Sequence, residues 1–306
     1  MTQNSTDIVR DMYLEWTANR IKGTPSDPEA WGDVTAEPRG VDYVELDAAG
    51  LPAMWAVPKG CDDDRTLLCM HGGGFVGGSI YTHRKLFAHL AKAVGVRALL
   101  FDYRLAPDHP HPAQVDDATD VYQWLIEEHE VDPGHVAFAG DSSGGGLAMT
   151  VQLRARERGL RLPAAALLMS PWVDMEQAGE SYRSNWGTET FFYKELVDGL
   201  AATFLGTEGD PTDPLASPIQ ADLHGLAPLF IQVGGDETLL DDSRALAERA
   251  LGAGVETELE VFAGQQHTFQ MAAGRSAQAD EAIEMFARWL RPKLGLSAAV
   301  AVAVGG

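Results

Sequence analysis

The chain has 306 residues, 45% of them hydrophobic and 22% charged, a composition typical of a folded globular protein rather than a disordered one. Lys and Arg number 23 against 45 Asp and Glu, so the formal net charge is −22. A chain this acidic repels nucleic-acid phosphates and anionic membrane surfaces, and we expect neither as a partner.

The sequence predicts neither a secretory signal nor a membrane span. Its N-terminus has no basic start and no continuous apolar run. The apolar segment near the C-terminus, residues 298–304, is only about a third of the length that a bilayer requires. Cys61 and Cys69 are too few for a disulfide framework or a zinc site. We therefore expect a soluble, cytoplasmic protein with a flexible tail over residues 297–306.

The N-terminal forty residues are predicted to be helix and loop. Ser5 is a candidate cap for a helix that runs to about Arg20, because apolar residues recur there at helical spacing. A loop rich in Pro, Gly and Asp, with room for one short helix, follows over Gly23–Gly40. Two alternating runs, Val41–Leu46 and Leu51–Val57, then predict an antiparallel hairpin.

Beyond the hairpin, apolar runs of strand length alternate with helical segments. Runs that are apolar on both faces are typical of a buried parallel sheet, and the alternation predicts right-handed βαβ units with helices on both faces. The expected strands are Thr66–Met70, Val96–Phe101, His135–Ala139, Ala164–Met169, Leu229–Val233 and Glu256–Phe262. The expected helices are His83–Val94, Gln114–Glu128, Gly145–Arg158, Ser243–Ala253 and Ala277–Leu290. The interval Asp174–Gly225 has no buried strand, and we expect it to lie over the carboxyl ends of the strands, where open α/β sheets bind ligands.

A candidate nucleophile lies between an expected strand and an expected helix. The segment Gly140–Gly144 fits G-x-S-x-G, a pattern that is weak alone but specific when a strand precedes it and a helix follows. Such a turn places the serine on a strained corner with its hydroxyl exposed. Of the two serines, only Ser142 has glycine both two residues before and two residues after it, so we assign Ser142 as the nucleophile.

A serine nucleophile needs a base and an orienting acid, which in this strand–turn–helix context follow in the order Ser, acid, His. His224 precedes the strand that would carry the acid, which leaves His267 as the base. We assign Asp236 as the acid because it directly follows that strand. The competing acids, which we expect instead to be solvated or to cap the next helix, are Glu237, Asp241 and Asp242.

A glycine run predicts the site that holds the oxyanion. The residues His71-Gly72-Gly73-Gly74 directly follow a strand, and consecutive glycines let backbone amides approach an anion. A phosphate loop is the alternative, but the spacing and the Lys-Ser/Thr ending of nucleotide loops are missing. The expected donors are the amides of Gly73, Gly74 and Ser143, and His71 is expected to be structural.

Taken together, these motifs resemble those of a known family. The set comprises His71–Gly74, Tyr103–Pro107, Gly140–Gly145, Ser170-Pro171-Trp172, Asp236 and His267. In order and spacing it is similar to the hormone-sensitive-lipase-like branch of the α/β-hydrolases, which are carboxylic-ester hydrolases with a helical cap. Within that branch, segments such as Trp186–Tyr193 look most like the monoterpene ε-lactone hydrolases.

The resemblance implies one α/β-hydrolase domain over residues 1–306, with a mostly parallel sheet, an antiparallel start and a cap built from residues 1–40 and 174–225. It also implies no cofactor and no metal, and a homodimer through the last strand. The segment Asp108–His111 fits a structural turn rather than a metal site. Trp186, Phe191 and Phe192 are candidates for lining a substrate pocket under the cap.

We therefore predict a serine hydrolase that cleaves carboxylic esters or lactones of small apolar substrates through an acyl-enzyme. One alternative is a non-catalytic binder of a small ligand on the same fold, as in gibberellin receptors, which resemble this branch but have lost the catalytic histidine. An amidase is the other, because ester and amide hydrolysis use the same groups.

Overall fold

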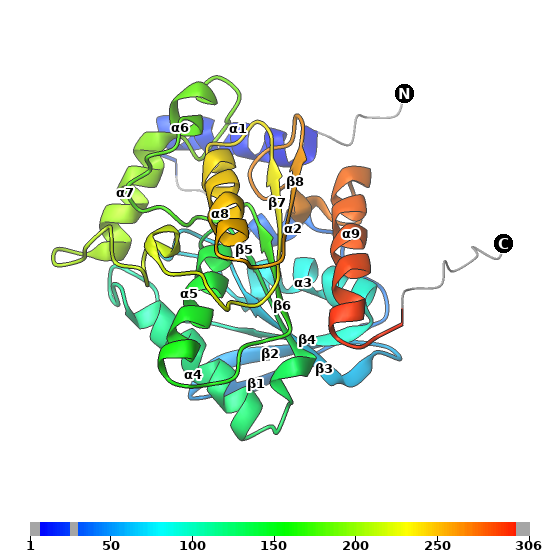
Figure 1. Cartoon of the computed structure of the whole chain (residues 1–306). Helices are drawn as coiled ribbons and strands as arrows, with labels where there is room; N and C mark the ends of the chain where they lie inside the picture. The colour runs from blue at the N-terminus through cyan, green and yellow to red at the C-terminus, as the bar shows by residue number, and fades with distance from the viewer. Residues whose placement is uncertain (1–6, 25–29, 298–306) are drawn as a thin grey trace.

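A twisted sheet of eight strands runs through the centre of the protein, with helices on both of its faces (Figure 1). The computed structural model describes residues 7–24 and 30–297. Along the sheet the strand order is β1-β2-β4-β3-β5-β6-β7-β8. The strands are β1 Val41–Ala48, β2 Leu51–Pro58, β3 Asp62–Met70, β4 Val96–Phe101, β5 Val136–Asp141, β6 Ala165–Met169, β7 Leu229–Gly234 and β8 Thr257–Phe262.

Strand pairing confirms the prediction of a mostly parallel sheet with an antiparallel start. β1 pairs antiparallel with β2, and β2 pairs antiparallel with β4, whereas all later neighbours are parallel. The predicted hairpin is β1–β2. The third strand begins at Asp62, before the predicted Thr66, and its register against β4 shifts between these two residues, so the polar start of this strand carries an irregularity that hydropathy alone did not reveal.

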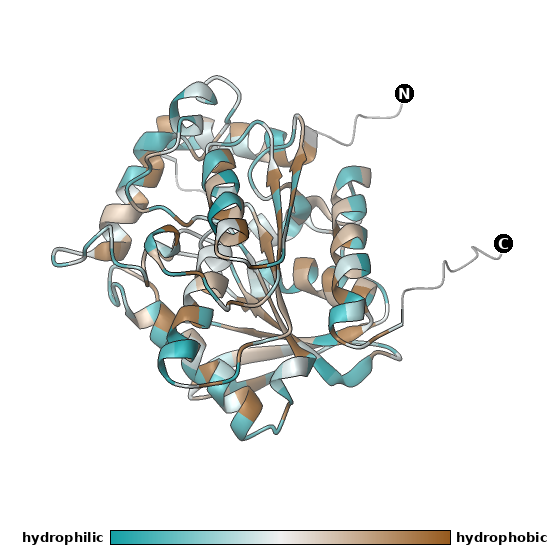
Figure 2. Ribbon diagram, in the orientation of Figure 1, coloured by the Kyte–Doolittle hydropathy of each residue, from teal (hydrophilic) through white to brown (hydrophobic). Residues whose placement is uncertain are grey.

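Five long helices pack against the sheet, as the alternating pattern predicted. Helices α3 (Ile80–Val94) and α9 (Ala277–Lys293) lie together on one side (Figure 1). Helices α4 (Ala113–Glu127), α5 (Ser143–Glu157) and α8 (Leu240–Gly252) lie on the other. Hydropathy follows this layering: in Figure 2 the central strands are mostly brown, and the helices carry teal on their outward faces.

The helix α3 starts earlier than the predicted His83 because a capping box fixes its N-terminus. The Ser79 hydroxyl accepts hydrogen bonds from the amides of Tyr81 and Thr82, each at 3.2 Å, and the Thr82 hydroxyl in turn accepts from the Ser79 amide at 2.9 Å. Such reciprocal bonds satisfy amides that a helix start otherwise leaves unpaired.

The remaining helices come from the two segments expected to form a cap. The N-terminal segment contributes α1 (Asp7–Ile21) and α2 (Trp31–Val34), and the insertion contributes α6 (Ser181–Ser184) and α7 (Lys194–Leu205). Short 3-10 turns are η2 (Pro133–His135), η3 (Pro218–Gln220) and η4 (Phe269–Ala272). The predicted cap residue Ser5 and, apart from Ser297, the predicted tail at residues 297–306 lie outside the described residues.

The parallel register brings six loops to one edge of the sheet. Met70 at the end of β3 pairs with Gly140 of β5, and Met169 at the end of β6 pairs with both Asp141 of β5 and Gln232 of β7. The loops that follow β4, β3, β5, β6, β7 and β8 therefore leave the sheet side by side. Among residues 7–24 and 30–297, no helix is both long enough and apolar enough to span a membrane.

Candidate active site

Ser142 lies on a sharp turn between β5 and α5, as the strand–turn–helix pattern predicted. Its backbone has φ 53° and ψ −122°, a conformation that L-residues rarely adopt. The Ser142 amide donates to the Met169 carbonyl at 2.8 Å, and its carbonyl accepts from the amides of Gly146 and Trp172. Contacts on both sides of the turn therefore hold this strained backbone in place.

The glycines around Ser142 are required by close packing. A Cβ at Gly140 would lie 2.2 Å from the Gly144 carbonyl oxygen, and one at Gly144 would lie 2.0 Å from the Met70 carbonyl oxygen. The first turn of α5 is thus pressed against β5 and against the end of β3. Helix α5 begins at Ser143, two residues before the predicted start, because the helix follows the turn at once.

Ser142, His267 and Glu237 form a continuous chain of hydrogen bonds. His267 Nε2 lies 2.9 Å from Ser142 Oγ, and His267 Nδ1 lies 2.9 Å from Glu237 Oε1. All three side chains are buried. The structure therefore brings Ser142 and His267 together as the sequence analysis expected, but with a different carboxylate.

The assignment of Asp236 as the acid is wrong, because the turn after β7 directs that side chain outward. Asp236 is 27% exposed, and its carboxylate lies 3.8 Å from the guanidinium of Arg10. Glu237 is instead folded back over the end of β7, where its Oε2 accepts hydrogen bonds from the Gly234 amide at 2.8 Å and from the Ser170 hydroxyl at 2.7 Å. The glutamate thus takes the position that the sequence analysis gave to its neighbour.

Two further competitors for the acid lie where the sequence analysis expected them, at the start of a helix. Asp241 Oδ2 accepts a hydrogen bond from the Ser181 amide at 2.8 Å, and Asp242 Oδ2 accepts from the Val173 and Asp174 amides. Burial raises the pKa of Asp242 to about 8. Rather than being solvated, both carboxylates attach the insertion to the first turn of α8.

The surroundings of His267 favour its protonated form. Burial by itself lowers the pKa of this imidazole, but the adjacent Glu237 carboxylate, with smaller contributions from Glu189 and Asp141, outweighs burial and raises the pKa above its ordinary value. A carboxylate on Nδ1 also fixes the tautomer in which Nδ1 carries the proton and Nε2 faces the serine as an acceptor.

The glycine loop after β3 lies directly against the turn that carries Ser142. The Gly72 amide donates to Asp141 Oδ1 at 3.0 Å, and a Cβ at Gly72 would lie 2.3 Å from the same carboxylate. Gly73 has φ 122° and Gly74 has φ 64°, conformations that favour glycine. Above the loop, the Leu200 side chain of α7 would lie 2.9 Å from a Cβ at Gly74, so the insertion covers this edge of the site.

His71, the histidine that begins the glycine loop, has the contacts of a structural residue. The His71 ring stacks on Tyr103 with 4.2 Å between centroids, and its Nδ1 lies 2.8 Å from the Gly72 carbonyl oxygen. Burial, with some repulsion from His83, lowers the pKa of His71 to about 3, so this imidazole is neutral at physiological pH. The neutral ring supports the glycine loop, in keeping with the structural role expected for it.

Aromatic residues of the two cap segments pack against His267. The ring centroid of Phe192 lies 4.5 Å from that of His267, and Phe191 and Phe192 each lie 5.5 Å from Tyr13 of α1. Trp186 is 65% exposed and is not part of this cluster, so its predicted place in the pocket is not supported. The sequence analysis missed Tyr13, whose buried hydroxyl donates to the His267 carbonyl at 3.1 Å.

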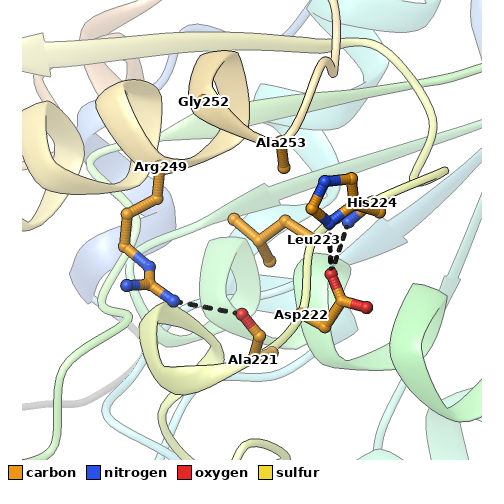
Figure 3. Close-up of a pocket in the computed structure, with 7 residues that line it drawn as sticks. All are labelled: Ala221, Asp222, Leu223, His224, Arg249, Gly252 and Ala253. Carbon is orange, nitrogen blue, oxygen red and sulfur yellow. Dashed lines mark hydrogen bonds and ion pairs between the residues drawn. The ribbon is translucent and has the colours of Figure 1, made fainter.

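His224, the other histidine after Ser142, lies at the surface. It lines a pocket of about 360 Å³ next to the C-terminal end of α8, and Figure 3 shows its ring beside the Asp222 carboxylate. Its side chain is 73% exposed, and its Nδ1 lies 2.7 Å from Asp222 Oδ1. This position agrees with its exclusion as the base.

The structure describes no cluster of three or more His, Cys, Asp or Glu side chains within residues 7–24 and 30–297 that is arranged to hold a metal ion. Within the Asp108–His111 segment, His111 Nε2 lies 2.9 Å from the Asp213 carboxylate, so this histidine connects the segment to the insertion.

Comparisons with known proteins agree with the fold. Residues 67–271 match a family model described as the alpha/beta hydrolase fold. The chain is 38% identical over 268 residues to an acetyl-hydrolase of Streptomyces hygroscopicus, covering 87% of each chain. It is 36% identical over 214 residues to an esterase of Acinetobacter venetianus, covering 70% of each.

Among solved structures, the protein is similar to an esterase of the bacterial hormone-sensitive lipase family, with a TM-score of 0.90 and 41% identity. That match covers 96% of this chain and all of the other. The family model and the two sequence relatives each extend over more than half of the chain. The chain therefore belongs to the hormone-sensitive-lipase-like family of the α/β-hydrolase fold.

Proposed function

We propose that this protein hydrolyses carboxylic esters or lactones of small apolar compounds through a Ser142–His267–Glu237 triad and an acyl-enzyme. The observation that carries the proposal is the chain of two 2.9 Å hydrogen bonds from Ser142 through His267 to a buried carboxylate. The esterase and acetyl-hydrolase relatives support ester hydrolysis as the reaction class.

The first half of the reaction forms the acyl-enzyme. Ser142 Oγ attacks the carbonyl carbon while His267 Nε2 takes its proton, and Glu237 stabilises the imidazolium that results. The negative charge on the carbonyl oxygen is met by the backbone amides of Gly73, Gly74 and Ser143. The amide of Ser143 suits this role because the first amides of a helix have no acceptor within the helix. The imidazolium then protonates the leaving alcohol oxygen, and the bond to that oxygen breaks.

The second half of the reaction repeats these steps with water. His267 takes a proton from a water molecule as its oxygen attacks the acyl carbon, and the same amides hold the new oxyanion. When this intermediate collapses, Ser142 receives the proton from His267 and the carboxylic acid leaves. For a lactone, the leaving oxygen remains attached to the acyl part, so the product is a hydroxy acid.

Small apolar substrates are supported by what surrounds the triad. Phe192 packs beside His267, and Leu200 lies over Gly74, so two apolar side chains of the insertion border the site. Apolar walls favour alkyl or alicyclic acyl groups, and the cover over the glycine loop favours short ones.

A hydrolysis panel tests the proposal. We expect purified protein to cleave p-nitrophenyl acetate and butyrate and ε-caprolactone or a terpene-derived lactone, and to cleave p-nitrophenyl palmitate at least about tenfold more slowly. Released p-nitrophenol measures the esters, and acid release at constant pH measures the lactones. Absence of turnover on every ester and lactone would favour a non-catalytic ligand binder, whereas cleavage of anilides alone would favour an amidase.

We also propose that two copies of the chain associate through β8. This strand ends the sheet and pairs only with β7 within the described ranges, so its outer edge presents backbone donors and acceptors to a second strand. Light scattering after size-exclusion chromatography is expected to give twice the 33.0 kDa mass of one chain. A single-chain mass at micromolar concentration would contradict this association.

A further inference from the structure

Glu189 is a buried carboxylate that the triad does not use. It lies in the insertion, on the stretch between α6 and α7, and is only 7% exposed. Burial raises the pKa of this carboxyl, while hydrogen bonds from backbone amides oppose the rise. A charged group is rarely kept in such a place without partners, so its contacts indicate what it does.

Each hydrogen bond that this carboxylate accepts in the described structure comes from a backbone amide. Glu189 Oε1 accepts from the amides of Thr190, Phe191 and Phe192 at 2.8, 2.8 and 3.0 Å. Its Oε2 accepts from the amide of Thr238 at 3.3 Å. Since every one of these partners is a donor, the ionised carboxylate satisfies them without a proton of its own.

These bonds connect the insertion to the turn that carries Glu237. Thr238 directly follows Glu237, and its hydroxyl also donates to the Phe192 carbonyl at 2.7 Å. Asn185 Nδ2, from the same stretch of the insertion, donates to the Glu237 carbonyl at 2.8 Å. Hydrogen bonds of Glu189 and its neighbours therefore hold the backbone around Glu237 against the insertion.

The same stretch of the insertion reaches the histidine. The Phe192 ring, whose amide is bound by Glu189, lies against the ring of His267. The Thr190 hydroxyl donates to Gln266 Oε1 at 2.6 Å, on the residue directly before His267. Glu189 thus orders one short segment that contacts both the acid and the base of the triad.

We propose that Glu189 is a positioning residue of the active site, whose negative charge and backbone contacts together hold Glu237 and His267 in register with Ser142. This role rests on the proposed function, because it acts through the triad. The carboxylates whose charges act on His267 are Glu237 after β7, Glu189 in the insertion and Asp141 at the end of β5. Glu189 is the one that belongs to the insertion, so this one group both helps to attach the insertion and adds to the basicity of the histidine.

The test compares two substitutions of Glu189 with a matched control. Glu189→Gln keeps the size and one acceptor oxygen but removes the charge, and turns an NH₂ group toward the Thr238 amide. Glu189→Asp keeps the charge but shortens the reach. Glu195→Gln, an exposed carboxylate in the first turn of α7, makes the same change in net charge away from the triad.

We measure kcat and KM on p-nitrophenyl butyrate, the pH dependence of kcat/KM, and the rate at which phenylmethylsulfonyl fluoride sulfonylates Ser142. Glu189→Gln is expected to lower kcat and the sulfonylation rate at least about tenfold while KM changes less than about twofold. The acid limb of kcat/KM is expected to move about 0.5 unit to lower pH, because losing a negative charge lowers the pKa of His267.

Glu189→Asp is expected to lower kcat as well, but to leave the acid limb within about 0.2 unit of the parent, because the charge remains. Glu195→Gln is expected to match the parent in all three measurements. Since a purely structural role would move the limb alike in both Glu189 variants, an equal shift in the two would overturn the proposal. So would an unchanged kcat in folded Glu189→Gln.

The sulfonylation rate keeps this test separate from that of the proposed function. A parent protein that is sulfonylated at Ser142 but cleaves no ester contradicts the proposed substrates, and its sulfonylation rates still decide the role of Glu189. A parent that is neither sulfonylated at Ser142 nor active on esters contradicts the triad itself, and with it the role of Glu189.

Discussion

Replacing Ser142 by alanine is expected to lower kcat on p-nitrophenyl butyrate on the order of 10⁵-fold or more, because the variant has no oxygen with which to form the acyl-enzyme. The residual rate would come from the amides that hold the oxyanion. Alanine keeps the Cβ and removes one hydroxyl, so the fold and its melting temperature are expected to change little. Initial rates and circular dichroism on the same preparation check both expectations.

The neighbouring serine makes this a sharp test. Phenylmethylsulfonyl fluoride is expected to modify the parent protein once, with the adduct located on Ser142 by peptide mass spectrometry, and to leave Ser142→Ala unmodified. An adduct on Ser143, or ester turnover that survives in Ser142→Ala, would show that the nucleophile has been misassigned.

The nucleophile and the base could be predicted from the sequence because their constraints are local or topological. Glycine at −2 and +2 of Ser142 reflects backbone atoms that approach within 2.0–2.2 Å of where side chains would begin. The chain order then excluded His224, and the structure places that residue at the surface. Neither inference required knowing where any side chain points.

The acid could not be chosen in the same way, because Asp236 and Glu237 are adjacent on one turn. Which of the two faces inward depends on the dihedral angles of that turn and on the Gly234 amide and Ser170 hydroxyl that hold the inner carboxylate. Ser170 directly follows another strand, β6, and has φ 46°. Hydrophobic periodicity contains no information about such a contact between distant loops.

The residues of the cap were the hardest to assign from sequence. Trp186 and Phe192 belong to one aromatic-rich segment, yet one is largely exposed and the other packs against His267. Glu189 looked like any polar residue of this insertion. A single acidic residue two positions before a pair of phenylalanines is a weak signal, and its role is recognised only from the amides that surround its carboxylate.

The pair Glu237→Gln and Asp236→Asn decides between the two carboxylates. Glu237→Gln is expected to lower kcat by about 10³- to 10⁴-fold, because an amide at Nδ1 neither stabilises the imidazolium nor enforces the tautomer that leaves Nε2 free to accept the serine proton. Asp236→Asn is expected to lower kcat less than about threefold, since it removes only a partly exposed ion pair with Arg10, and such pairs contribute about 0–1 kcal/mol.

The pH dependence of kcat/KM in these two variants tests the choice of acid independently of the loss in kcat. Because Glu237 is the main group that raises the pKa of His267, its loss is expected to move the acid limb of the residual kcat/KM to lower pH, whereas Asp236→Asn leaves the limb in place. The two substitutions change the net charge equally and lie one residue apart, so any effect of overall charge or of local backbone disturbance is shared. A larger loss of kcat in Asp236→Asn than in Glu237→Gln would mean that the turn after β7 adopts another conformation during catalysis, one that exchanges the inward and outward carboxylates.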